Sequence, residues 1–503
     1  MENFWMIPTV AGSIVLTLRL LLISQREHYI AGRTSRVIWM WLKAKPWPHI
    51  LLVAGASLLQ VLLGGSVGSS TACFVLCVFS PVGFPLRQRD AWPKWTRRLR
   101  VLAFVHFAIM LSMVVTAVIL GLPVDVLPLA IFASLLVSCE LALRLTGPFE
   151  EVVAERYLNE AVTKLKSVNP RVVGITGSWG KTSTKNHLRD LIGEHLRVVA
   201  SPASFNNQNG LSMTINEMVD SRTELLIAEI GMYGEGEIAK ICDWLRPEVA
   251  VITAIGPMHL ERVGSIDAIK RAKSEILNHA PVGVFWMGDV NVALIAKEFH
   301  LPKTVSCGMF GSDCNVEVSV GQNINTYFVH GETIGSLPAG ELHHENVACA
   351  IGVALALNVP TKVLSEGLQR MLPVGHRAET FSSDSGALVI DDTFNSNPSG
   401  AKRALKILED FRGSRRIVVT PGFFELGHQQ AEKTREFVES SLAAGVEVIF
   451  VGYSNRRAVA SLAKHSGSEL RLVASRTKAK KILSNLGSHD AILWENDLPV
   501  HLP

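Results

Sequence analysis

Residues 101–121 of this 503-residue chain form an apolar stretch of 21 residues without a formal charge. About 20 apolar residues are enough to cross a bilayer as a helix. A chain with such a stretch either places it in a membrane or buries it completely in a protein core. Four more apolar segments lie in the same third of the chain, so the pattern predicts a transmembrane region of about five helices in residues 1–146. The other four segments are 5–24, 49–66, 70–86 and 125–143.

Basic residues are concentrated between these segments. Residues 1–145 carry 13 Lys and Arg against 5 Asp and Glu, a net charge of +8, so the rest of the chain carries −4 of the total of +4. Cytoplasmic loops are enriched in Lys and Arg, which places segments 25–48 and 87–100 on the cytoplasmic side. Five spans then put everything after Arg144 in the cytoplasm, and predict a multi-pass protein of the inner cell membrane. The tryptophans of these loops fit interfacial anchors: Trp39, Trp41, Trp47, Trp92 and Trp95.

Two other interpretations of this apolar third stay open. A cleaved signal peptide is the alternative for the first segment, although no basic start precedes it. A buried all-helical core is the alternative for the whole region. The seven cysteines are odd in number and scattered, which fits a reducing compartment. Because the positive charge is local to the apolar third, it does not indicate a nucleic-acid partner.

From Arg171 onward, short β-rich runs alternate with helical stretches. Apolar strands separated by helices predict parallel sheets covered on both faces. The alternation restarts near residue 380, so we expect two α/β domains, at 147–379 and 380–503. The expected strands are 171–175, 224–230, 248–254, 282–286, 387–390, 415–420, 446–451 and 490–494.

The first of these strands leads into a glycine-containing turn, TGSWGKTST, and then a helix. Glycines let backbone N–H groups turn toward an anion, and the helix N-terminus adds a favourable dipole. Lys181 is expected at the β- and γ-phosphates of a nucleotide, and Thr182 at its Mg²⁺. The long phosphate-loop pattern is not met because Ile175 stands at its first glycine, but the shorter G-x-x-G-K-T form is met. The residues predicted to hold the nucleotide are Gly177, Ser178, Gly180, Lys181, Thr182 and Ser183.

Further motifs follow this phosphate loop along the chain. They are Ser204–Gly210 (SFNNQNG), Ala228–Gly231 (AEIG), Ile255–Glu261 (IGPMHLE), Arg271–Glu275 (RAKSE), Asp391–Pro398 (DDTFNSNP) and Glu425–Gly427 (ELG). In this order they resemble the Mur ligases, the ATP-dependent amide ligases of peptidoglycan synthesis, and most closely the D-alanyl-D-alanine-adding members. The resemblance covers nearly all of residues 170–503. It implies a Mur ligase central P-loop ATPase domain followed by a C-terminal Rossmann-like domain.

The resemblance also implies the chemistry. ATP phosphorylates a carboxylate, and an amine then attacks the acyl phosphate to form an amide. Glu229 and Thr182 would hold the Mg²⁺ on the nucleotide, while His259 and a carbamylated Lys273 would hold a second Mg²⁺. Carbamylation by CO₂ turns an ammonium into an anionic ligand, which suits a site for two divalent cations. The implied catalytic residues are Lys181, Lys273, His259 and Asn395.

Other residues match family positions around the nucleotide. Asn346 resembles the asparagine that meets adenine, although here Gly340–His343 (GELH) replaces the G-R-H-N of the family. Arg377 resembles an interdomain arginine that reaches the nucleotide. Asp391 or Asp392 would bind the ribose, and Asn395 and Asn397 would help to close the site.

The family's N-terminal domain for the UDP-sugar has no counterpart here, because apolar segments stand in its place. We therefore expect a membrane-anchored amide ligase that couples an amino acid or dipeptide to a cell-envelope precursor, with a lipid-linked precursor as one form of that acceptor. The alternatives are a poly-γ-glutamate-type amide ligase and a non-catalytic ATP-binding membrane scaffold. The sequence leaves the oligomeric state open.

Overall fold

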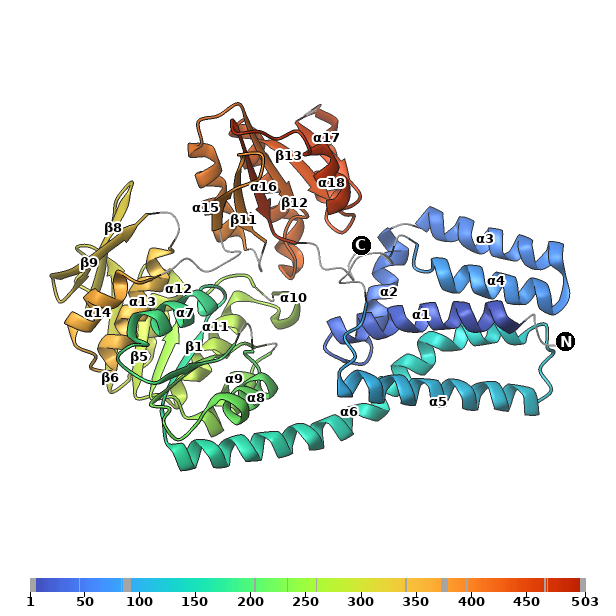
Figure 1. Ribbon diagram of the computed structural model, residues 1–503, viewed down its shortest axis with the longest axis horizontal. Coiled ribbons are helices and arrows are strands. Elements are labelled where there is room, and N and C mark those ends of the chain that lie inside the picture. Colours follow the sequence, from blue (N-terminus) through green and yellow to red (C-terminus); the bar gives the residue numbers. More distant parts are fainter. Residues whose placement is uncertain are drawn as a thin grey trace. The chain divides into compact units, whose positions relative to one another are not determined.

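The structure is a computed structural model, and it divides into two compact units. The first is Met1–Ala154 together with Gly452–Ser454 and Leu498–Pro503, and the second covers Glu155–Val451 and Asn455–Asp497. Figure 1 shows the elements of both units. The residues that the structure describes are 6–44, 46–82, 84, 92–202, 205–232, 234–258, 260–339, 342–371, 379–393, 397–465, 467 and 469–497.

The first unit is helical. Each of the five predicted apolar segments forms a helix, and one further helix, α2, was not predicted. Four helices, α1, α3, α5 and α6, are long and apolar enough to cross a membrane, whereas α4 has only 15 residues. The bounds are α1 (Met6–Arg26), α2 (Arg33–Ala44), α3 (Pro46–Leu63), α4 (Gly65–Phe79), α5 (Arg97–Ile119) and α6 (Leu127–Val168).

Helices α3 and α4 form an antiparallel hairpin. The backbone N–H of Val82, just after α4, donates to Nε2 of His49 near the start of α3, at 2.8 Å. The 15 residues of α4 span about 22 Å at 1.5 Å per residue, less than the roughly 30 Å of a hydrocarbon core. The chain nevertheless returns along α4 to the end of the bundle where α3 begins.

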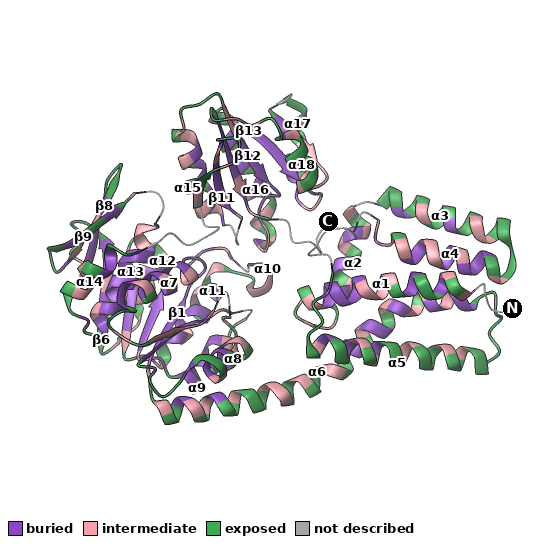
Figure 2. Cartoon of the chain, in the orientation of Figure 1, coloured by how far each residue is buried: buried purple, intermediate pink, exposed green. Residues whose placement is uncertain are grey.

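Apolar side chains cover the outside of this unit as well as its interior. Leu62 and Ile119 are 70% and 78% exposed, and Phe104 on α5 is 72% exposed. Figure 2 shows long exposed faces on α3 and α5. Polar groups lie inside instead: His106 is buried between the hydroxyls of Thr17 and Ser138, at 3.2 and 3.1 Å. This inside-out distribution is typical of helices that face lipid.

The second unit begins with an α/β domain built on a nine-stranded sheet of order β2-β3-β1-β4-β5-β6-β7-β8-β9. The strands from β2 to β7 are parallel, and β8 and β9 add an antiparallel extension. Its strands are β1 (Arg171–Thr176), β2 (Val198–Ala200), β3 (Leu225–Glu229), β4 (Val249–Ile252), β5 (Val282–Trp286), β6 (Lys303–Met309), β7 (Val316–Val320), β8 (Ile324–Val329) and β9 (Glu332–Pro338).

Helices cover both faces of this sheet, so its central strands are apolar on both sides. On β1, Val173 and Ile175 pack with α7, α13 and α14, whereas Val172 packs with the other helices. The helices are α7 (Lys181–Ile192), α8 (Gln208–Met218), α9 (Glu237–Leu245), α10 (Leu260–Val263), α11 (Ile266–Ser274), the 3₁₀ turn η2 (Glu275–Asn278), α12 (Val290–Glu298), α13 (His344–Ala356) and α14 (Thr361–Leu368).

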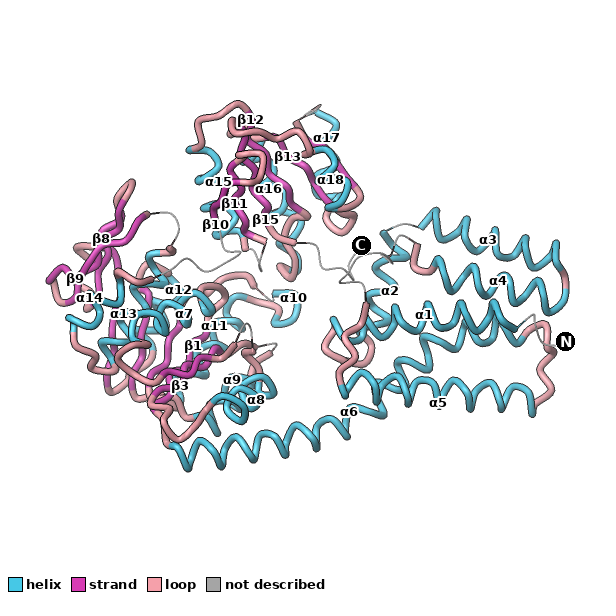
Figure 3. The backbone as a smooth tube through the Cα atoms, viewed as in Figure 1, coloured by secondary structure: helices cyan, strands magenta, loops and turns pink. Residues whose placement is uncertain are grey.

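A second α/β domain follows, with a six-stranded sheet of order β10-β11-β15-β12-β13-β14 in which only β10 is antiparallel. Figure 3 shows both sheets with their covering helices. The elements are β10 (Glu379–Ser382), β11 (Leu388–Asp392), α15 (Pro398–Asp410), β12 (Arg415–Thr420), η3 (Gly427–Gln429), α16 (Gln430–Ala443), β13 (Glu447–Val451), α17 (Arg456–His465), β14 (Leu470–Val473), α18 (Arg476–Ile482) and β15 (Asp490–Glu495).

All eight predicted strands are confirmed as β1, β3, β4, β5, β11, β12, β13 and β15. The sequence analysis missed seven others, including the hairpins β7 to β9. Each of these three outer strands includes exposed as well as buried positions. They therefore lack the continuous apolar run by which the central strands were recognised.

Candidate active site

The phosphate loop joins β1 to α7 and depends on glycine at two positions. Gly180, the N-cap of α7, has φ of 83°, a left-handed conformation that favours glycine. A Cβ atom there would lie 2.4 Å from Oδ1 of Asn346. A Cβ atom on Gly177 would lie 2.0 Å from Oγ1 of Thr253. Both glycines therefore allow the loop to pack against neighbouring side chains.

Hydrogen bonds from the segment that follows β4 hold this loop in place. Ser178 donates its backbone N–H to the carbonyl of Ala254 at 2.7 Å. Its hydroxyl donates to the carbonyl of Gly256 and accepts from the N–H of the same residue, at 3.0 and 2.9 Å. The hydroxyl of Thr253 donates to the carbonyls of Trp179 and Thr176. These bonds fix the backbone of the loop before any ligand binds.

Lys181 begins α7 and folds back over the loop. Its ammonium donates to the carbonyl of Gly177 at 2.8 Å. Because the N-terminus of α7 lies at the same loop, a positive charge and a helix dipole act on one place. This combination suits the phosphates of a nucleotide.

Glu229 lies at the carboxyl end of β3 and is almost fully buried, at 1% exposure. Its Oε2 accepts from the hydroxyl of Thr182 at 2.8 Å and from the ammonium of Lys185 at 3.1 Å. Its Oε1 accepts from Nδ2 of Asn206 at 3.2 Å. Thr182 and Glu229, which were both predicted at the Mg²⁺ site, are therefore hydrogen-bonded to each other. Lys185 and Asn206, which were not predicted, also bind Glu229.

Two opposing effects act on the Glu229 carboxyl. Burial alone would raise its pKa, but the charges of Lys181 and Lys185 and the hydrogen bonds from Thr182 and Lys185 outweigh burial, so the pKa lies below its ordinary value of 4.5. Glu229 is therefore an anion at neutral pH, with oxygen atoms of the kind that Mg²⁺ prefers.

Lys273 on α11 is also buried, at 1% exposure. Burial, and then the positive charge of Lys181, lower its pKa well below the ordinary value of 10.5. The amine therefore loses its proton readily, and a neutral amine is the form that reacts with CO₂. The charge of Lys181 acts on Lys273 and on Glu229 alike, which connects both to the phosphate loop.

Asn346 lies in the first turn of α13 and is buried against the phosphate loop. Its Oδ1 accepts from the hydroxyl of Thr184 at 3.5 Å. Next to it, the His344 ring packs against Trp286 at 5.7 Å, which gives His344 a packing role. Among the described residues, no group of three or more His, Cys, Asp and Glu side chains could hold a metal ion.

The second α/β domain contributes the predicted aspartates. Asp391 accepts from the N–H and the hydroxyl of Thr393, at 3.1 and 2.6 Å, and Asp392 is buried beside it at the end of β11. Arg262 and Glu425 form an ion pair of 2.7 Å between α10 and the ELG turn. The predicted residues His259, Arg377 and Asn395 lie outside the described part of the chain.

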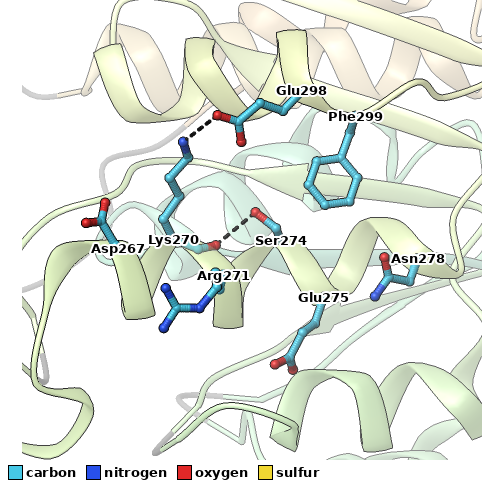
Figure 4. A pocket seen from close by; sticks show the side chains of 8 residues that line it. All are labelled: Asp267, Lys270, Arg271, Ser274, Glu275, Asn278, Glu298 and Phe299. Carbon is cyan, nitrogen blue, oxygen red and sulfur yellow. Dashed lines mark hydrogen bonds and ion pairs between the residues drawn. The ribbon is translucent and has the colours of Figure 1, made fainter.

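A separate hollow of about 280 Å³ lies between α11 with η2 and α12. In Figure 4, Lys270 faces Glu298 across it, and their ion pair measures 2.9 Å. The hollow contains none of the predicted site residues. Its lining residues are Asp267, Lys270, Arg271, Ser274, Glu275, Asn278, Glu298 and Phe299.

The structure thus gathers most of the predicted nucleotide and metal residues at the carboxyl edge of the first sheet. Ser183 is buried in the first turn of α7. Sequence reasoning missed three residues: Lys185, Asn206 and Thr253. Lys185 lies one helical turn after Lys181, and this spacing was the available signal. Asn206 lies in a motif that was recognised but not assigned to the carboxylate.

Comparison with known proteins agrees with this geometry. Residues 175–354 match the Mur ligase middle domain, and residues 376–495 match the Mur ligase, glutamate ligase domain. A UDP-N-acetylmuramoyl-tripeptide–D-alanyl-D-alanine ligase of Bacillus subtilis is 30% identical over 268 residues, which are 52% of this chain and 58% of the relative. The chain thus spans less than two thirds of the length of that relative.

Solved structures show the same fold. MurF from Acinetobacter baumannii has a TM-score of 0.59 at 25% identity, over 68% of this chain and 77% of that chain. MurF ligase from Thermotoga maritima in complex with ADP has a TM-score of 0.58 at 22% identity, over 69% of this chain and 81% of that chain.

The first prediction concerns Gly180. Gly180→Ala is expected to abolish binding of a fluorescent ATP analogue, because the new Cβ collides with Asn346 and the backbone is strained. Gly236→Ala is the matched control, since Gly236 has φ of 86° at a helix N-cap but open space around it. The control should lose about 1–2 kcal/mol of stability from the left-handed backbone and keep its nucleotide affinity. Equal affinities in the two variants would contradict the packing argument.

The second prediction concerns Lys185. Lys185→Met should cost about 3–5 kcal/mol of unfolding free energy at neutral pH, because one partner of a buried ion pair is lost. The folded-state pKa of Glu229 is lowered, so this stabilisation is complete above the ordinary carboxyl pKa near 4.5 and declines as the pH falls through the folded-state pKa.

Chemical denaturation across this pH range measures the effect. Arg156→Met removes the exposed pair with Glu160 and should change stability by less than about 1 kcal/mol at every pH. A loss from Lys185→Met that does not depend on pH would show that packing, and not charge, explains it.

Proposed function

Because the chain carries the middle and C-terminal domains of the Mur ligase family, we propose that it is a membrane-anchored, MurF-like, ATP-dependent amide ligase. It couples an amino acid or dipeptide to a carboxylate of a cell-envelope precursor. The observation that carries the proposal is the pairing of Thr182 with the buried Glu229 at the end of the phosphate loop. We assign residues 1–146 to the membrane, 147–379 to the central ATP-binding domain and 380–503 to the C-terminal domain.

ATP and Mg²⁺ are the expected ligands, and the donor set fits them. Thr182 and Glu229 offer hard oxygen atoms, and Mg²⁺ commonly takes one or two protein ligands together with phosphates and waters. When bound there, Mg²⁺ would neutralise charge on the phosphates during phosphoryl transfer. Lys181 and the N–H groups at the start of α7 hold the phosphates, while Asn346, Arg377, Asp391 and Asp392 are assigned to the nucleoside.

The reaction then follows in two steps. A carboxylate oxygen of the acceptor attacks the γ-phosphorus, and the bond from that phosphorus to ADP breaks, giving an acyl phosphate. The amine attacks the acyl carbon, phosphate leaves with the bonding electrons, and the amine loses a proton. The chain contributes positioning and charge compensation in both steps. Asn395 is assigned to closing the site.

We assign Lys273 as a carbamylated lysine. Together with His259, it would hold a second Mg²⁺. The supporting observation is that burial and Lys181 both favour the neutral amine of Lys273. Its nitrogen attacks CO₂, loses a proton and becomes an anionic carbamate. The product carries the negative charge that a site for two divalent cations needs.

The membrane assignment rests on the first unit. Four helices have the length and composition of membrane spans, and their outward faces are apolar. A buried helical core would not leave Leu62, Phe104 and Ile119 more than two thirds exposed. The ligase domains are assigned to the cytoplasm, where ATP is available, and a lipid-linked precursor is the form of acceptor that such an anchor favours.

Two alternatives receive less support. A non-catalytic scaffold would not need Lys181, Thr182, Glu229 and Lys273 together, and all four are present. A poly-γ-glutamate-type ligase does not account for the SFNNQNG and DDTFNSNP segments.

The third prediction tests catalysis. Lys181→Ala should weaken binding of a fluorescent ATP analogue about 10- to 100-fold, because hydrogen bonds to charged groups contribute about 1.5–3 kcal/mol. Cells that depend on this variant should accumulate an envelope precursor that lacks the added amino acid or dipeptide, seen by mass spectrometry. Lys166→Ala, an exposed change on α6, is the control. Unchanged precursors in cells whose protein no longer binds ATP would favour the scaffold.

The fourth prediction tests the carbamate. In ¹³C-bicarbonate, the purified chain should give a carbamate signal by ¹³C NMR, and Lys273→Met should remove it. Lys270→Met is the control, because Lys270 lies on the same helix and pairs with Glu298. A signal that survives Lys273→Met, or its absence from the unmodified chain, would contradict the assignment.

A further inference from the structure

The basic segments of the first unit meet at one end of its helical bundle. Nε2 of Gln25, near the end of α1, donates to the carbonyl of Lys94 at 2.7 Å. The guanidinium of Arg98, at the start of α5, lies 4.3 Å from the ring of Tyr29. Arg98 also pairs with Glu150 of α6 at 3.8 Å. These contacts bring the ends of α1 and α5 and the middle of α6 together.

Helix α2 is fixed at this same end. Glu140 of α6 accepts from the N–H of Gly32 at 2.5 Å and from the N–H and hydroxyl of Ser35, at 2.8 and 2.6 Å. Trp41 is buried on the inner face of α2. The opposite face therefore points away from the bundle.

That outward face combines positive charge with an aromatic ring. Arg36, Trp39 and Lys43 follow at spacings of three and four residues and are all exposed. The ammonium of Lys43 lies 5.3 Å from the ring of Trp39. Trp47, just beyond α2, is 73% exposed. Basic side chains beside exposed tryptophans are typical of a helix that lies at the membrane–water boundary.

Basic side chains outnumber acidic ones at this end. Its described carboxylates include Glu27, which pairs with Arg33, Glu140 and Glu150, whose partners are given above, and the exposed Glu151. The opposite end of the bundle is formed by parts of segments 46–82 and 101–139. These segments contain no Lys or Arg and a single acid, Asp125. The exposed basic residues of the basic end are Arg26, Arg36, Lys43, Lys94, Arg97, Arg100 and Arg144.

We propose that this basic end, formed by the outer face of α2, the start of α5 and Arg144, is a binding surface for the phosphate groups of anionic phospholipids. The inference rests on the proposed membrane anchoring and adds a lipid preference to it. Arg and Lys near the surface attract anionic headgroups electrostatically. At a lipid surface the tryptophan rings lie at the depth of the headgroups. An acidic protein partner would instead leave these rings in water.

The experiment uses the full chain in nanodiscs of phosphatidylcholine that contain a trace of dansyl-labelled lipid. Energy transfer from the tryptophans to dansyl-phosphatidylglycerol is compared with transfer to dansyl-phosphatidylcholine. The unmodified chain should enrich the anionic lipid, and added salt should reduce the enrichment. A variant with Arg36→Gln, Lys43→Gln, Arg97→Gln and Arg100→Gln should lose most of the preference for the anionic lipid.

The matched control replaces four exposed lysines of the second unit, with Lys297→Gln, Lys362→Gln, Lys478→Gln and Lys480→Gln. It should keep the full preference. The proposal is overturned if the first variant keeps the preference, if the control loses it equally, or if soluble polyglutamate displaces the lipid and binds the same residues. Binding of the fluorescent ATP analogue shows that each variant is folded. A chain that binds ATP but does not enter nanodiscs would refute the membrane anchoring itself, and lipid preference without ATP binding would refute the ligase.

Discussion

The buried carboxylate of Glu229 is the charge around which the candidate site is built. Desolvation of an anion at the end of an apolar strand is costly unless partners compensate it. Thr182, Lys185 and Asn206 supply that compensation from α7 and from the segment before α8. These bonds hold the start of α7 against the end of β3. The phosphate loop is therefore already in place, and a nucleotide does not have to order it.

The sequence predicted the central parts of this site because their signals are local. A strand, a glycine turn and Lys181 with Thr182 are contiguous, and Glu229 ends an apolar strand of its own. Lys185 and Thr253 were missed because their roles depend on contacts across 44 and 77 residues. The spacing of Lys185 after Lys181 places both on one face of α7, but this spacing does not show that a carboxylate lies against that face. The same holds for β7 to β9, whose pairing is set by neighbours and not by composition.

In the first unit, composition predicted the existence of the helices and the basic segments but not their arrangement. Helix α2 has mixed polarity, so a search for long apolar runs passed over it. Its position depends on Glu140, which lies 105 residues from Ser35 and satisfies the N–H groups at the start of the helix. A carboxylate within an apolar segment thus has a structural function: it orients the tryptophan and the basic residues of α2.

Two buried lysines of the central domain show how position determines chemistry. Lys185 and Lys273 are both about 1% exposed, and burial alone would favour the neutral amine in each. Lys185 forms an ion pair with Glu229 at 3.1 Å, so the carboxylate compensates its positive charge. Lys273 has the like charge of Lys181 acting on it, so nothing opposes the effect of burial. Lys185 therefore serves as a counter-ion, and Lys273 is suited to react as a nucleophile. The residue type alone does not distinguish these two roles.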